Sequence, residues 1–198
     1  MKQELAPIVY RLIRSDRKTL AMEWRSGELI VRAPRFASKQ RIDAFVASNR
    51  ERIEAWQRKE RQHDAALSDW PPLSDEDVRE LYRQAKIAIP QRAAYYAPLI
   101  GVQYGRITVR MQKTRWGSCS AAGNLNFNAL LMLAPPEVLD IVVVHELCHR
   151  KEMNHSKRFY AEVQRVFPAY RKWNRWLKEN GPVLLKLAEN AGDNVNLP

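Results

Sequence analysis

The sequence predicts an α+β protein in which a few short strands precede a mainly helical part. Residues 8–32 roughly alternate apolar and polar positions around the turn signal Ser26-Gly27, which is typical of paired strands. Later segments instead carry apolar residues three and four positions apart, which indicates helices. A chain of 198 residues is long enough to bury a substantial core without disulfides.

The first part of the chain, residues 1–61, is expected to form an N-terminal strand meander followed by a helix. The strands are predicted at residues 8–14, 19–24 and 28–32. Ser38 is a suitable N-cap for the helix that follows them. The apolar residues of this helix recur at helical spacing and are Ile42, Phe45, Val46, Ile53 and Trp56.

Residues 62–74 are predicted to be a linker, because they combine polar residues with two consecutive prolines. The second unit is expected to span residues 75–198. It begins with a helix that Ser74 caps and whose first turn is acidic, as the helix dipole favours. Pro90 is expected to bend or divide this helix, and a strand is predicted at residues 106–111.

Three further elements lead to the most informative segment. Residues 114–124 are predicted to form a loop and residues 125–131 a short strand. Pro135 and Pro136 suit the first positions of the next helix. Because that helix is apolar on nearly every side, it is expected to be buried.

Two histidines and a glutamate interrupt this apolar helix. His145 and His149 are four residues apart, so both rings lie on one helix face at a separation that suits two ligands of one zinc ion. Glu146 lies between them, where its carboxylate can take the proton of a zinc-bound water. Polar groups buried without partners are unfavourable, which favours a metal site over ordinary core residues. The pattern predicts a zinc-dependent hydrolase, with other divalent metals as alternative cofactors.

His155 is the expected third ligand, because three of the four histidines fall within eleven residues. The helix must then end soon after Glu152, and Asn154 tolerates the left-handed conformation that such a turn uses. The alternative ligand is Glu152, which would share a face with His145 and His149 if the helix continued. Ligand type and turn chemistry favour His155.

A longer set of residues accompanies the metal motif. It comprises Thr114-Arg115-Trp116-Gly117-Ser118-Cys119-Ser120, Gly123, Asn126-Phe127-Asn128, His145-Glu146-Leu147-Cys148-His149 and Asn154-His155-Ser156 with Phe159. This set resembles the YgjP-like metal-dependent hydrolases, relatives of the SprT-like and WLM zincins, and the resemblance extends weakly to the N-terminal strands. It implies a zincin-like catalytic domain of a small sheet and helices. It also implies His145, His149 and His155 as ligands and Glu146 as the catalytic acid and base.

Two further expectations come from zincins. In peptide-cleaving members, an extended substrate adds to the edge strand above the catalytic helix, and this edge is expected near residues 125–131. The spacing from His145 to His155 also equals that of the metzincin proteases. Those enzymes have a glycine where this chain has Glu152, so the turn must be made differently here, which argues against a metzincin.

Arg115 is the candidate substrate-binding residue outside the metal motif. Its guanidinium could bind an anionic substrate group or a developing oxyanion, and the alternative is an ion pair that fixes the loop over the helix.

The formal net charge is +11, with 14 Lys/Arg against 7 Asp/Glu in residues 11–61 and 9 against 2 in residues 150–178. This excess favours an anionic partner, including non-specific contact with nucleic acid. No RNA-binding signature or zinc-finger spacing accompanies it.

Three functions follow from these residues. The first is a metallopeptidase, because the His-Glu-x-x-His chemistry more commonly acts on peptides. The second is a metal-dependent nucleoside triphosphate pyrophosphatase of the UTP type, an activity that the resemblance also implies; the sequence shows no P-loop and no acidic cluster for magnesium. The third is a basic nucleic-acid-associated module with a structural metal, although Glu146 argues against a purely structural site.

The remaining features concern location and redox state. The longest apolar runs are far too short to cross a bilayer, and the N-terminus lacks the apolar segment of a secretory signal. We therefore expect a cytoplasmic protein without membrane association.

Cys119 and Cys148 are expected to remain reduced, and Cys148 is expected to point away from the metal. No feature of the sequence specifies an oligomeric state.

Overall fold

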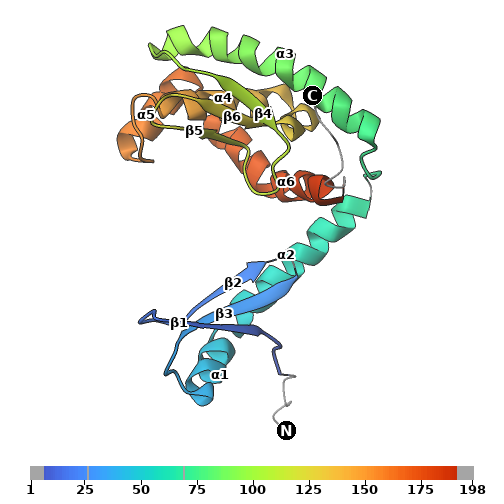
Figure 1. Ribbon diagram of the computed structural model, residues 1–198, viewed down its shortest axis with the longest axis vertical. Helices are drawn as coiled ribbons and strands as arrows, with labels where there is room; N and C mark the ends of the chain where they lie inside the picture. The colour runs from blue at the N-terminus through green and yellow to red at the C-terminus, as the bar shows by residue number, and fades with distance from the viewer. Residues whose placement is uncertain (1–6, 26, 69, 191–198) are drawn as a thin grey trace. The chain divides into compact units, whose positions relative to one another are not determined.

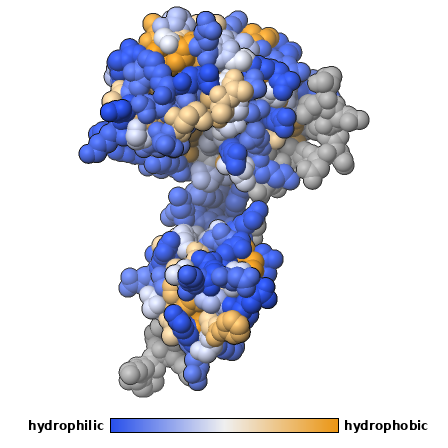
Figure 2. Space-filling model, turned by 60° about the vertical axis from the view of Figure 1, so that its left-hand side comes forward, coloured by the Kyte–Doolittle hydropathy of each residue, from blue (hydrophilic) through white to orange (hydrophobic). Residues whose placement is uncertain are grey.

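The computed structural model describes residues 7–25, 27–68 and 70–190. The chain divides into two compact units, residues 1–65 and 66–198, and each has a hydrophobic core of its own. Each unit contains one small sheet and helices, so the predicted α+β class is confirmed (Figure 1). Hydrophilic residues cover most of the visible surface of both units (Figure 2). None of the described helices is long and apolar enough to cross a membrane.

The sheet of the first unit contains the three predicted strands in a different order. These are β1 (Arg11–Ser15), β2 (Ala21–Arg25) and β3 (Glu28–Pro34). β2 and β3 form an antiparallel hairpin, but β1 pairs in parallel with the other side of β3, so the strands do not form a simple meander. β3 carries the buried apolar run 29–31, which explains why this strand takes the middle position.

The predicted turn and helix of this unit also differ in detail. Gly27 has a φ of 79°, in the left-handed region that a tight hairpin turn uses; Ser26 lies outside the described residues. Ser38 caps the helix as predicted, since its hydroxyl accepts from the backbone N–H of Arg41. The helix is interrupted at Asn49, whose side chain donates to the carbonyl of residue 45 over 2.8 Å. Two helices result, α1 (Lys39–Ser48) and α2 (Arg50–Ser68).

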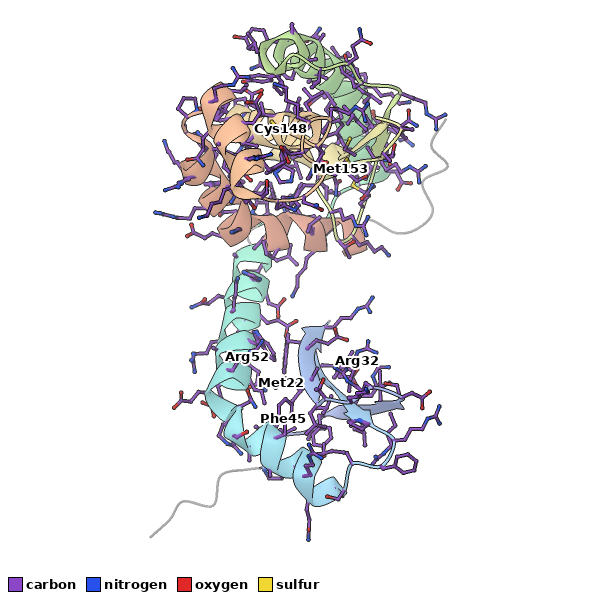
Figure 3. The ribbon with its side chains drawn as sticks, turned by 90° about the vertical axis from the view of Figure 1, so that its left-hand side faces the viewer. Met22, Arg32, Phe45, Arg52, Cys148 and Met153 are labelled. Carbon is purple, nitrogen blue, oxygen red and sulfur yellow. The ribbon has the colours of Figure 1, made fainter. Side chains whose placement is uncertain are left out.

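The core of the first unit lies between this sheet and the two helices. The residues buried there include Leu29, Val31, Ile42, Val46 and Ile53, and Met22 from β2 packs against them (Figure 3).

The predicted linker is partly helical. α2 continues through residue 68, because residues 62–68 contain no glycine or proline and include the good helix formers Ala65, Ala66 and Leu67. Only residues 70–74, with their two prolines, are irregular among the described residues of this segment.

The second unit begins with α3 (Asp75–Ile100). Ser74 caps it as predicted: its hydroxyl accepts from the backbone N–H of Asp77, and the Asp77 carboxylate accepts from the backbone N–H of Ser74. Pro90 lies inside one continuous helix and does not divide it. Gly101 ends the helix with a φ of 78°.

The sheet of this unit corrects two expectations. Its strands are β4 (Ile107–Arg110), β5 (Gly117–Cys119) and β6 (Leu125–Asn128), in the order β4-β6-β5. Residues 114–124 were predicted as a loop, yet they contain β5. Residues 125–131 were predicted as the edge strand, but β6 is the middle strand, and the chain continues into the 3-10 helix η1 (Ala129–Leu133). β6 takes the middle because its side chains are almost entirely buried, and the edge strand that contacts the helix with the metal motif is β5.

Three helices complete the second unit: α4 (Pro136–Cys148), α5 (Lys157–Val166) and α6 (Tyr170–Asn190). α4 is buried on nearly every side, as predicted, and lies between α3 and α6 (Figure 1). It also contacts α5 and β5. The metal motif therefore lies on the most enclosed helix of the unit.

Candidate metal centre

The structure brings together the three histidines that the sequence singles out. His145 and His149 come from the C-terminal end of α4, and His155 comes from the turn before α5. One ring nitrogen of each lies within 4.8 Å of the others. The Nε2 atoms of His145 and His155 are 3.0 Å apart. Three imidazole nitrogens that converge in this way form a donor set that could hold one metal ion.

The turn between α4 and α5 brings His155 to the other two rings. α4 ends at Cys148, earlier than the predicted end near Glu152. The backbone N–H of Arg150 donates to the carbonyl of Leu147 over 2.9 Å, a bond that tightens the last turn of the helix. Ser156 then caps α5, because its hydroxyl accepts from the backbone N–H of residue 159.

Glu152, the alternative third ligand, contributes its backbone rather than its carboxylate. Its carbonyl lies 3.1 Å from Nδ1 of His149. Because a carbonyl can only accept, Nδ1 carries the proton and the lone pair of the neutral ring is on Nε2. The Glu152 carboxylate is not part of the cluster found among the described residues. The geometry therefore favours His155 over Glu152.

Tyr170 supports the first histidine. Its hydroxyl lies 3.2 Å from Nδ1 of His145, and its side chain is buried at the start of α6. A partner on Nδ1 fixes the orientation of an imidazole whose Nε2 faces a metal. This contact was not predicted from the sequence, because it joins residues 25 positions apart on different helices.

The protonation of the site follows from burial. Burial, together with the smaller effect of the neighbouring rings of His149 and His155, lowers the pKa of His145 to about 3. His145 is thus neutral, the state in which imidazole binds a metal. Burial raises the pKa of Glu146 to about 8, and a cation bound at the histidines would oppose that rise. Neutral imidazoles beside one carboxylate suit zinc in a catalytic site.

Glu146 lies directly against the edge strand. Its side chain is only 6% exposed. A Cβ atom placed on Gly117 of β5 would lie 2.7 Å from Oε1 of Glu146. Only a residue without a side chain leaves this space to the carboxylate, so the backbone of β5 passes close over Glu146.

A cavity of about 260 Å³, which we call the active-site cavity, opens beside His145 and Glu146. Residues from the loop before β5, from α4 and from α6 line it. Its apolar wall consists of Trp116, Ile141, Val142 and Leu177. A cavity of this size is large enough for one apolar side chain.

Arg115 lines the same cavity and is exposed. In the part of the chain that the structure describes, its guanidinium has no ion-pair partner, so the loop is not fixed by such a pair. Asn128 fixes the loop instead. Its fully buried side chain donates to the carbonyls of Gln112 and Arg115, over 2.7 and 2.9 Å, and accepts from the backbone N–H of Leu130. Asn128 belongs to the set of residues that accompanies the metal motif, but the sequence does not indicate that its side chain holds the loop of Arg115.

The two cysteines are free thiols, as predicted. Cys148 lies inside the second unit (Figure 3) and belongs to its core, and it is not part of the histidine cluster found among the described residues. Burial raises the pKa of its thiol to about 12, which makes it a poor source of thiolate.

Comparison with known proteins places this site in a family. The model of the YgjP-like, metallopeptidase domain matches residues 71–180, more than half of the chain, including all three histidines and Glu146. Among solved structures, the chain is similar to the metallopeptidase zymogen of Pyrococcus abyssi abylysin. The identity is 21%, the match covers 46% of this chain and 93% of that chain, and the TM-score is 0.42. No curated protein matches. A metallopeptidase-type domain implies a metal-dependent hydrolase, and the chain belongs to the YgjP-like family.

Proposed function

We propose that the protein is a zinc-dependent peptidase in which Glu146 is the general base and then the general acid. The observation that carries this proposal is that Glu146 lines the same cavity as His145 and lies against the backbone of Gly117 in β5. His145, His149 and His155 would hold the ion. When bound, zinc polarises the carbonyl under attack and lowers the pKa of water.

Glu146 would move the proton during cleavage. Its carboxylate takes a proton from the attacking water while the water oxygen bonds to the carbonyl carbon of the substrate. The carbon–nitrogen bond then breaks, and Glu146 delivers the proton to the leaving amine. Glu146 is a buried residue, and this position would limit proton exchange with bulk water during these steps.

The edge of β5 provides a place for an extended peptide. Among the described strands β5 pairs only with β6, so its other side could accept an added strand. A strand added there would run past Gly117 and therefore past Glu146. The active-site cavity lies next to this path and would take an apolar side chain. Arg115, at the same cavity, is the proposed contact for a substrate carbonyl or a developing oxyanion.

The substrate class can be tested with zinc-loaded wild-type protein. It would be incubated with a mixed peptide library and, separately, with a panel of nucleoside triphosphates, and the products would be identified by mass spectrometry. We expect new peptide termini and no pyrophosphate. Triphosphate hydrolysis without peptide cleavage would instead support a pyrophosphatase, and no turnover of either would contradict the proposal. The variant Glu146→Gln controls for contaminating hydrolases.

A further inference from the structure

A second hollow adjoins the metal centre on the side of His155. It has a volume of about 540 Å³ and lies between α5 and α6. We call it the basic groove and define it by His155, Lys157, Tyr160, Arg171, Asn174 and Lys178.

The basic groove is adjacent to the active-site cavity. Tyr170 and Asn174 line both hollows, and His145 lines one while His155, 3.0 Å from it, lines the other. A substrate that extends from the active-site cavity past the histidines would therefore reach the basic groove.

The cations of the groove are not neutralised. Lys157, Arg171 and Lys178 line it, and none of its described lining residues is acidic. Among the described residues these three cations make no ion pair. Cations outside the groove do: Lys151 and Arg165 both pair with Glu162, over 2.7 and 2.8 Å.

Two of the cations lie on the same face of one helix. Arg171 and Lys178 are seven residues apart on α6, and Asn174 lies between them on the same face. Lys157, in the first turn of α5, belongs to the opposite wall. Positive charge held on both sides of a hollow attracts and orients an anionic group.

The two sides of the metal centre thus differ in chemistry. The active-site cavity has an apolar wall, whereas the basic groove is cationic. We propose that the basic groove is a substrate subsite that selects an acidic side chain, Asp or Glu, on one side of the cleaved bond. This inference rests on the proposed peptidase function and names the substrate class that this peptidase would prefer.

The test compares peptides that are identical except for Glu or Gln at one position, scanned along both sides of the cleavage site. At low ionic strength we expect wild type to cleave one Glu peptide with a kcat/KM about three- to tenfold above that of its Gln partner, as for solvent-exposed ion pairs. The ratio should fall towards one at high salt, because such pairs are screened.

Two variants assign the preference to the groove. In Arg171→Ala/Lys178→Ala, the Glu-to-Gln ratio should fall towards one, because only Lys157 of the three cations remains. In Arg171→Glu/Lys178→Glu, the enzyme should instead prefer Lys over Gln at that position. Lys86→Ala, which removes an exposed cation from α3, should keep the wild-type ratio. Equal cleavage of Glu and Gln peptides by wild type, or an unchanged ratio in the double variants, would overturn the subsite.

A binding measurement separates this inference from the proposed function. Fluorescently labelled Glu and Gln peptides would be titrated into zinc-loaded Glu146→Gln, with and without Arg171→Ala/Lys178→Ala. Suppose that wild type cleaves none of the peptides, but that Glu146→Gln binds the Glu peptide more tightly than the Gln peptide and loses this difference in Arg171→Ala/Lys178→Ala. The peptidase proposal then fails, whereas the binding site for an acidic side chain stands. If the Glu peptide shows no such advantage while UTP binding depends on the same cations, the groove binds phosphate and the acidic-peptide subsite is wrong.

Discussion

Gly117 and Glu146 are in such close contact that a Cβ atom on the glycine would lie 2.7 Å from the carboxylate oxygen Oε1. The contact joins the edge strand β5 to α4. A side chain at this position of the strand proposed to bind the substrate would displace the carboxylate proposed to move the proton.

Gly117→Ala should therefore displace the Glu146 carboxylate and leave the histidines in place. We expect peptide cleavage to fall on the order of 100-fold, as for a catalytic group moved by about 1 Å. Zinc content, measured by elemental analysis, should stay at the wild-type level. Ser118→Ala, on the same strand, is the control and should retain activity. A fully active Gly117→Ala would show that the close contact has no bearing on catalysis.

Tyr170→Phe should weaken metal binding. The change removes the hydroxyl that lies 3.2 Å from Nδ1 of His145 and orients that ring. Loss of such a partner typically lowers metal affinity about 10- to 100-fold. The affinity would be measured by competition with a chromogenic zinc chelator. Tyr160→Phe serves as the matched control, and equal affinities in all three proteins would refute a supporting role for Tyr170.

Asn128→Ala should destabilise the second unit and loosen the loop that carries Arg115. The change leaves the carbonyls of Gln112 and Arg115 without their donor. The free energy of unfolding should fall by roughly 1–3 kcal/mol, the usual effect of an unsatisfied buried group. Urea denaturation measures this, with the exposed Asn180→Ala as control. A loss no larger than that of the control would contradict the role given to Asn128.

Glu162 should make stability depend on pH in the acid range. Its hydrogen bond with Arg165, and then that with Lys151, lowers its pKa from 4.5 to about 2. A lowered pKa in the folded state means that the stabilisation is present above the unfolded value, near 4.5, and is lost as pH falls towards 2. The effect should be modest, because the side chains of both cations are about half exposed to solvent, which screens the interaction.

The check is thermal unfolding of wild type and Glu162→Gln between pH 7 and pH 2. The difference between their melting temperatures should be largest at neutral pH and should close in acid. Glu179→Gln removes an exposed carboxylate from α6 and should show a smaller difference at pH 7. A gap between wild type and Glu162→Gln that widened in acid would contradict the assignment.

The metal site could be predicted because its residues are close in sequence. Helical spacing alone brings His145 and His149 to one face, and a single turn brings His155 back. By contrast, Tyr170 and Asn128 act through contacts between elements that lie far apart along the chain. No local pattern encodes such contacts.

Strand order was the weaker part of the sequence prediction for the same reason. β5 has three residues and no β-branched or aromatic side chain, so propensity gives no sign of it. Which strand takes the middle of a small sheet depends on burial against helices elsewhere in the unit. The sequence therefore predicts that strands exist near residues 106–111 and 125–131 but places the edge on the wrong one.

The most direct test of the central claim measures zinc content and peptide cleavage on the same samples of wild type and Glu146→Gln. We predict one zinc ion per chain in both proteins, and cleavage that is about 100- to 10,000-fold slower in the variant, the usual contribution of general acid–base catalysis. A variant that keeps its zinc and cleaves as fast as wild type would contradict the role of Glu146. A wild type without bound metal would contradict the metal centre itself.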